Sequence, residues 1–431
     1  MIFRLYRAVA MLGIAAFLSI TAAATAQDTT RTVGANGKPI FAWPNEFSKA
    51  NSDDWLHVHH REIYQLRPKV LVLNFANGMS SVKADAKITE LFLALRESSR
   101  YHGYEDEDAS PELEYQLFKY VDLQDTDAVA EDQVLDGNST LYPRVPNWKE
   151  GINFQYGQLF SEKFAKLYGV ADPNKPGRFL TLKELVDQGQ IHEVWFFARQ
   201  GKFGAPFECT EVKQAYDTAG NKIPGKSVQA GNGGTPEQPF IGRSLRILFV
   251  NAERGPGCAL ESLGHAIEGT SNSGAIPYFT KYFTEFAGFD LKQRFNMPFD
   301  KLYDRDGAEL SYAAPDQIRY TYKGKAGKYL SYYTVGGSVH FAPNARHDYD
   351  LENTAPVLST IEHYRLHDGQ YEKDMKEPWT IGKIQKYRQL APDCQGPWMV
   401  YWRQNFPSFT SLKCTDDTRK QMKSWLPFLY Y

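Results

Sequence analysis

Hydrophobic positions gather into three short unbroken runs that predict buried strands. They are residues 69–75 (KVLVLNF), 191–198 (IHEVWFFA) and 245–250 (LRILFV), with a fourth extended run at 113–123. Continuous β-branched and aromatic runs are typical of strands covered on both faces. Because helical patterns lie between them, the sequence predicts an α/β fold with a mainly parallel sheet flanked by helices.

The segments between these runs predict helices and one long excursion. Apolar residues recur at helical spacing from Ile88 to Leu95, and residues 154–169 form an amphipathic pattern ending in glycine. A further helix starts at Thr181, where Glu184 stands three residues on, the spacing of a capping box. Residues 201–242 are rich in glycine and proline and too long for an ordinary connection, so we expect a functional loop there.

The pattern of hydrophobic and polar residues changes beyond residue 270. Residues 276–289 are aromatic and helical, residues 318–337 have the pattern of an antiparallel hairpin, and the rest is irregular and rich in Pro, Trp and Tyr. We therefore expect an α/β domain over 53–270. An aromatic-rich, loop-rich part over 271–431 forms either an elaboration packed over the sheet or a small second domain.

The first residues have the pattern of a secretory signal. Arg4 and Arg7 precede an apolar run over residues 8–20, and Ala24–Ala26 fit the small-residue cleavage rule. We expect a signal peptide over 1–26, a polar arm over 27–52, and a secreted or periplasmic protein that has no membrane association after cleavage. An uncleaved membrane anchor is the alternative.

Charge and cysteine content narrow the possible partners. The formal net charge of −2 gives no reason to expect nucleic acid as a partner. Four cysteines in an exported chain indicate disulfides. We expect Cys394–Cys414, which lie close together in a loop-rich tail, and by elimination Cys209–Cys258.

Three segments that follow predicted strands place a site at one edge of the sheet. They are ANG after Phe75, RQGKFG after Ala198 and NAERGPG after Val250. Ligands of open parallel sheets bind beyond the carboxyl ends of the strands. These segments therefore predict the location of the site.

The last of these segments leads into a helix with a polar face. Glu261, His265 and Glu268 fall within about 60° of one another on a helix, opposite an apolar stripe. One interpretation is a solvated surface. Another is an acid–base pair of Glu261 and His265, with Arg254 holding a substrate anion beside the backbone N–H groups of the helix start.

A metal site is the third interpretation of this helix, because ligands four residues apart converge on one ion. The polar loop 336–350 supplies the missing group, His340. We expect His265, Glu268 and His340 to bind a divalent metal such as zinc, with Glu261 as general base. In this loop Asn344, Asp348 and Asp350 would contact substrate or orient His340, or else form an Asx-turn network.

Three other features of the sequence are weaker indications of a functional site. Cys258, at the start of the same helix, could act as a nucleophile if it stays reduced. The sequence LHVHH at 56–60 resembles a metal-binding pair, although ordinary packing or exposure explains it as well. The sequence DRDG at 304–307 is too short for a calcium loop and predicts a turn.

These observations favour two functions. The first is an exported hydrolase, metal-assisted or not, that acts on a peptide or glycan polymer outside the cell. The second is a non-catalytic secreted protein that binds a glycan, a peptide or a small molecule, with Trp195, Trp398 and Trp402 as stacking surfaces.

The motifs ERG (253–255), ESLGHAIE (261–268) and HFAPNARHDYD (340–350) and the Trp-rich PWMVYWRQNFP resemble those of a family of uncharacterised secreted microbial proteins. The likeness covers most of the chain from about Lys69. The family has no established activity, so the resemblance implies no mechanism. It does imply that the two polar clusters belong together.

Overall fold

The computed structural model describes residues 41–45, 48, 52–125, 136–145, 152–201, 204–233, 237–305, 307–323, 325, 327 and 329–431. It consists of two units, Met1–Ala42 and Trp43–Tyr431. Of the first unit only Phe41 and Ala42 are described, so the predicted signal peptide lies outside the described residues. The second unit is compact and includes residues on both sides of position 270.

The second unit contains a six-stranded mixed sheet in the order β4-β3-β5-β8-β6-β7. The first four strands are parallel: β4 (Gln116–Asp122), β3 (Lys69–Asn74), β5 (Glu193–Ala198) and β8 (Leu245–Asn251). The three strongest predicted strands are thus direct neighbours, as expected for buried apolar runs. The fold is mixed α/β, with an antiparallel pair at one edge.

That antiparallel pair corrects the expected loop over 201–242. The segment contains β6 (Cys209–Tyr216) and β7 (Lys222–Gln229), which pair with each other and add to β8. Charged residues conceal β6 in the sequence, although the whole strand is buried. Its Lys213 Nζ lies 2.7 Å from Glu211 Oε1 and 3.0 Å from Ser244 Oγ, so the charges are satisfied inside the protein.

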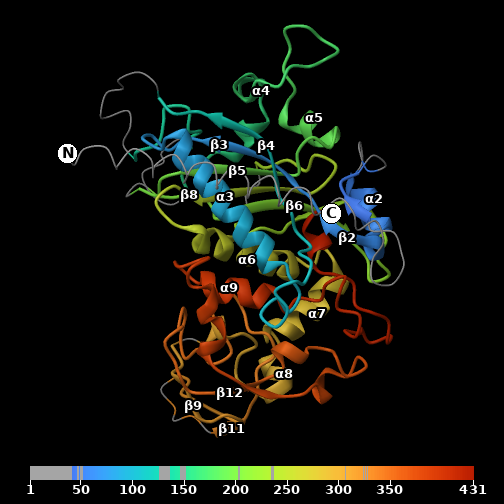
Figure 1. Ribbon diagram of the computed structural model, residues 1–431, viewed down its shortest axis with the longest axis vertical. Helices are drawn as coiled ribbons and strands as arrows, with labels where there is room; N and C mark the ends of the chain where they lie inside the picture. The colour runs from blue at the N-terminus through green and yellow to red at the C-terminus, as the bar shows by residue number, and fades with distance from the viewer. Residues whose placement is uncertain are drawn as a thin grey trace, which may run out of the picture. The chain divides into compact units, whose positions relative to one another are not determined.

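Helices cover both faces of the sheet (Figure 1). On one face lie α3 (Ser81–Ser98) and α6 (Pro256–Asn272), where Phe92 of α3 contacts Trp195 of β5. On the other face α4 (Glu162–Tyr168), α5 (Leu182–Asp187) and the 3-10 helix η4 (Tyr156–Phe160) form one hydrophobic core with β3 and β5. The predicted capping box of Thr181 and Glu184 is present at the start of α5.

The later part of the chain packs on α6 and continues below it in Figure 1. It holds α7 (Pro277–Ala287), α8 (Leu291–Phe295), α9 (Gly396–Arg403) and two small antiparallel sheets. The strands are β9 (Leu310–Ala314), β10 (Gln317–Tyr320), β11 (Tyr329–Ser331), β12 (Val357–Ser359) and β13 (Glu377–Trp379). The β10–β11 pair confirms the predicted hairpin.

Short elements complete the described chain. They are β1 (Phe41–Trp43), α2 (Ser52–Val58), η2 (His60–Glu62), β2 (Ile63–Leu66), η5 (Leu302–Asp304), η6 (Ile361–His363), η7 (Tyr371–Lys373), η8 (Ile381–Tyr387) and η9 (Leu426–Leu429). Among the helices described, none has the length and apolar character needed to cross a membrane.

The cysteine pairing differs from the expectation. Cys258 of α6 is bonded to Cys394, just before α9, while Cys209 and Cys414 are buried thiols. Both expected pairs, Cys394–Cys414 and Cys209–Cys258, are therefore wrong. The packing of α9 on α6 brings together two cysteines that are 136 residues apart, and sequence proximity gave no sign of this. The bond also removes Cys258 as a thiolate nucleophile.

Glu112 is expected to make the stability of the fold depend on pH. Its carboxyl group is buried, and burial raises its pKa to about 7, although hydrogen bonds from Ser424 and Ser408 oppose the rise. The folded chain then binds more protons than the unfolded chain between about pH 4.5 and 7. The stability contributed by this group falls as pH rises through that window, by about 3 kcal/mol.

The Glu112→Gln variant tests this expectation, because it cannot ionise. Urea unfolding from pH 5 to 8 should show the variant gaining stability relative to the native chain as pH rises. The exposed Glu90→Gln on α3 is the control and should leave the pH dependence unchanged. Parallel curves for the native chain and Glu112→Gln would contradict the raised pKa.

Candidate metal centre

Helix α6 carries its polar residues into the interior of the unit. It starts at Pro256, directly after the turn that follows β8, and Leu260, Leu263 and Ile267 form its apolar stripe. Glu261 and Glu268 are nevertheless only 6% and 5% exposed. The interpretation of this face as a solvated surface is therefore wrong, because the loop around His340 covers it.

Where the His340 loop covers α6, three side chains come together, namely Glu261, His265 and His340. The two Nε2 atoms of the histidines lie 2.9 Å apart. Glu261 Oε1 lies 3.6 Å from Nε2 of His340 and 3.9 Å from Nε2 of His265. Ligand atoms of a tetrahedral zinc ion with bonds of about 2.0–2.1 Å are about 3.3–3.4 Å apart. The three observed distances lie on both sides of this value, so the three atoms form a group that could hold a metal ion.

A carboxylate lies on the Nδ1 side of each imidazole ring. Nδ1 of His265 lies 3.3 Å from Glu268 Oε2, within hydrogen-bond distance, whereas Nδ1 of His340 lies 3.9 Å from Asp348 Oδ1, too far for a hydrogen bond. A neutral imidazole has one N–H and one lone pair, so an N–H directed at the carboxylate leaves the lone pair on Nε2. Metal-binding histidines in proteins are oriented in this way.

The carboxylates are themselves held in place. Glu268 Oε1 accepts a hydrogen bond from the backbone N–H of Val339 at 2.9 Å, and the Tyr303 hydroxyl lies 3.2 Å from both carboxylate oxygens. Arg305 Nη1 donates to Asp348 Oδ2 at 3.3 Å. Asp348 Oδ1 is buried and has no hydrogen-bond partner among the described residues. The hydrogen bonds of Glu268 therefore orient the His265 ring before any ligand binds.

Neighbouring charges shift the pKa values of Glu261 and His265 in this cluster. Burial alone would raise the pKa of Glu261, but hydrogen bonds with His340 and Tyr349 and the nearby imidazoles lower it. For His265, burial opposes the charged form, yet the Glu268 hydrogen bond and the charges of Glu268, Glu208 and Glu261 raise its pKa. The cluster therefore favours a positive charge between its carboxylates, which is the electrostatic requirement for a cation.

A cavity of about 390 Å³ opens beside Glu261, at the carboxyl ends of β5 and β8. The lining residues include Gln200, Glu208, Asn251, Arg254, Glu261 and Tyr349. This is the sheet edge that the sequence predicts for the site. A ligand in the cavity would contact Glu261 at one of its walls.

The start of α6 differs from the expectation. Its backbone N–H groups do not face an open anion site, because the Asp393 carboxylate accepts from Gly255 N at 2.6 Å and from Gly257 N at 2.9 Å. A Cβ atom on Gly257 would lie 2.0 Å from the backbone oxygen of Asp393, so this glycine permits close approach of the chain. Arg254 stays exposed and lines the cavity.

Several residues that the sequence predicts to contact a substrate make contacts within the protein instead. Asn344 is buried and donates to Asn353 O and Ala355 O, while Asp350 is buried against Arg346. These two residues therefore hold the loop and do not face the cavity. Asp348 lies near Nδ1 of His340, at 3.9 Å, without a hydrogen bond to it. The stacking tryptophans are all completely buried, namely Trp195, Trp398 and Trp402.

Two residues near the centre were not singled out from the sequence. Tyr349 lies over His340, with ring centroids 4.1 Å apart, and Glu208 lines the cavity just before β6. Tyr349 stands between Asp348 and Asp350, which were singled out, and Glu208 lies in the segment expected to be a functional loop. Neither has a spacing pattern of its own that marks it.

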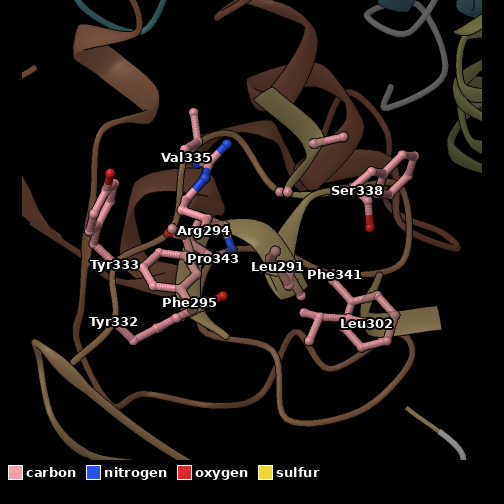
Figure 2. Close-up of a pocket in the computed structure, with 16 residues that line it drawn as sticks. Leu291, Arg294, Phe295, Leu302, Tyr332, Tyr333, Val335, Ser338, Phe341 and Pro343 are labelled. Carbon is pink, nitrogen blue, oxygen red and sulfur yellow. The ribbon is translucent and has the colours of Figure 1, made fainter. Parts of the chain in front are cut away.

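The remaining sequence candidates lie elsewhere. His60 is buried between Tyr431 OH and Ser424 O, which is the packing interpretation of LHVHH. Asp304 ends η5, and Asp306 lies outside the described residues. Figure 2 shows a second cavity, walled by Arg294, Tyr332 and Phe341 among others, of only about 20 Å³. That volume fits about one water molecule.

A scan against models of protein families finds no match for this chain, and a search of curated proteins finds none with significant similarity. The resemblance of the four motifs to a family of uncharacterised secreted microbial proteins therefore stays a prediction.

Proposed function

We propose that Glu261, His265 and His340 bind a divalent metal ion, with zinc the best match, and that the chain is a metal-dependent hydrolase. The proposal rests on one observation, the two Nε2 atoms that face each other at 2.9 Å. At this distance one ring can donate an N–H to the lone pair of the other. A divalent cation between the rings would replace that shared proton, and both lone pairs would then bind it.

The ligand chemistry supports zinc and a catalytic role. Two histidines and one glutamate are a ligand set of zinc hydrolases, in which a fourth position holds water. A zinc ion bound here would lower the pKa of such a water and polarise the bond to be broken. The cavity beside Glu261 would admit a substrate to this position.

The proposed ligand set differs from the one derived from the sequence. Glu268 was expected to bind the metal and Glu261 to act as the base. We now assign Glu261 to the metal, because its carboxylate faces both Nε2 atoms, and Glu268 to the orientation of His265, because it faces Nδ1. Arg254 keeps its proposed role as the group that holds a substrate anion.

The substrate class is a polymer outside the cell, a peptide or a glycan. A disulfide between Cys258 and Cys394 is compatible with an exported protein, and the predicted signal peptide supports the same proposal. The alternative of a non-catalytic binding protein relied on three tryptophans as stacking surfaces, and all three are completely buried. The hydrolase is therefore the better supported of the two.

Metal content and affinity test the proposal. Protein purified without chelator and without an affinity tag should contain about one zinc per chain by elemental analysis. Zinc titrations of the apoprotein should show that His265→Ala and His340→Ala lose this binding, while His363→Ala, a partly buried histidine of η6, keeps it. Unchanged zinc affinity in both site variants would overturn the proposal.

A further inference from the structure

Tyr349 is held over the centre in an unusual backbone conformation. Its φ of 63° lies in the left-handed region, where a bulky residue is rare. Half of the residue is exposed, its ring contacts His340, and it lines the cavity together with Glu261. Tyr349 thus lies at the cavity wall beside the proposed metal.

The surrounding loop keeps Tyr349 in this position. Asp350 accepts hydrogen bonds from the backbone N–H and the guanidinium of Arg346, and from the backbone N–H groups of Glu352 and Asn353. Tyr349 N donates to His340 O at 3.1 Å. The buried Asp350 therefore fixes the turn that presents Tyr349.

Glu208 reaches the same cavity from a different element. It stands just before β6, and its backbone oxygen accepts from Phe249 N of β8 at 3.0 Å. Its side chain accepts from Asn232 Nδ2 and lines the cavity together with Glu261 and Tyr349. Glu208 thus adds a carboxylate outside the ligand set to the wall of the cavity that Glu261 also lines.

We propose that Glu208 and Tyr349 are catalytic residues of this centre and that the bond it hydrolyses is an amide. This inference rests on the proposed function. A hydroxyl donor suits the carbonyl oxygen of an amide, which gains negative charge as water attacks. The proposal therefore favours a peptide over a glycan.

The step conserves atoms and charge. The oxygen of water forms a bond to the carbonyl carbon while Glu208 takes one of its protons, and the π-electron pair moves to the carbonyl oxygen, which accepts a hydrogen bond from Tyr349. The carbonyl then re-forms, the C–N bond breaks, and the nitrogen takes the proton from Glu208. The products are a carboxylic acid and an amine.

Cobalt and acetohydroxamate serve as probes, because a hydroxamate offers a metal both of its oxygens and resembles an amide under attack. The full chain is loaded with Co²⁺, whose visible spectrum reports ligation, and acetohydroxamate is then titrated. We expect Tyr349→Phe and Glu208→Gln to keep the cobalt affinity within about threefold. Each variant should bind acetohydroxamate at least about tenfold more weakly, because it loses a strong hydrogen bond.

Matched variants separate the possible outcomes. Tyr329→Phe on β11 and Glu162→Gln on α4 alter exposed residues and should behave like the native chain. Native affinity for acetohydroxamate in either site variant overturns its assigned role. Loss of cobalt in Tyr349→Phe overturns it as well, since Tyr349 would then support the metal itself. Failure of the native chain to bind cobalt overturns the proposed function, and this inference with it.

Discussion

Glu261→Ala is expected to weaken zinc binding on the order of a thousandfold, whereas Glu268→Ala should weaken it only about 10- to 100-fold. The first variant removes a proposed ligand. Structural zinc sites bind with about 10–16 kcal/mol through four ligands, so one ligand accounts for about 2.5–4 kcal/mol, the upper end of which corresponds to about a thousandfold in affinity. The second variant removes only the group that orients a ligand.

The contacts explain why the two carboxylates differ. Glu261 Oε1 faces Nε2 of both histidines, at 3.9 and 3.6 Å. Glu268 lies on the other side of the His265 ring, at Nδ1, and its oxygens contact Tyr303 and the backbone N–H of Val339. Glu268 could not reach the metal without giving up these hydrogen bonds.

Competition titrations with a chromogenic zinc chelator measure both affinities on the same scale. Glu90→Ala, on the exposed face of α3, is the control for a lost carboxylate. A larger loss for Glu268→Ala than for Glu261→Ala would contradict our assignment. It would restore the ligand set derived from the sequence, with His265, Glu268 and His340 on the metal.

The sheet could be predicted because each of its main strands is marked by a short stretch of sequence. The apolar runs of β3, β5 and β8 are continuous, and a parallel strand buried on both faces leaves such a record. Strand β6 was not recognised, because Glu211 and Lys213 neutralise each other inside the protein and therefore look like surface residues in the sequence. The disulfide pairing was not predictable for a different reason, because it depends on how α9 packs on α6, two helices far apart in the sequence.

The candidate site was predictable in part. The helical spacing of Glu261, His265 and Glu268 and the polar character of the His340 loop are visible in the sequence, and the structure brings them together. Which ring nitrogen of each histidine faces which carboxylate depends on a contact between segments 75 residues apart. No spacing rule could therefore separate the ligand from the orienting group.

Arg246→Met is expected to destabilise the protein by about 3–5 kcal/mol, because it leaves buried charge without its partner. Arg246 of β8 is 2% exposed and joins two buried carboxylates, Glu193 of β5 at 2.9 Å and Glu211 of β6 at 3.2 Å. Its Nη2 also donates to the backbone oxygen of Leu429 in η9, so it connects the C-terminal segment to the sheet.

The two carboxylates are not equally dependent on this arginine. Glu211 keeps its contact with Lys213, whereas the hydrogen-bond donors left to Glu193 among the described residues are neutral, the Trp195 indole and the Tyr115 hydroxyl. Most of the loss should therefore come from Glu193. The double variant Arg246→Met/Glu193→Gln should recover part of the stability, because the unpaired negative charge is gone.

Urea unfolding of the native chain, the two variants and Arg178→Met measures this difference. Arg178 pairs with Asp172 and Glu184 at the surface, so its loss should change the unfolding free energy little. Equal losses for the single and the double variant would show that the charge of Glu193 is not the cause, and that the cost lies in the lost donor to Leu429 and the packing around it. A native-like midpoint for Arg246→Met would contradict the prediction altogether.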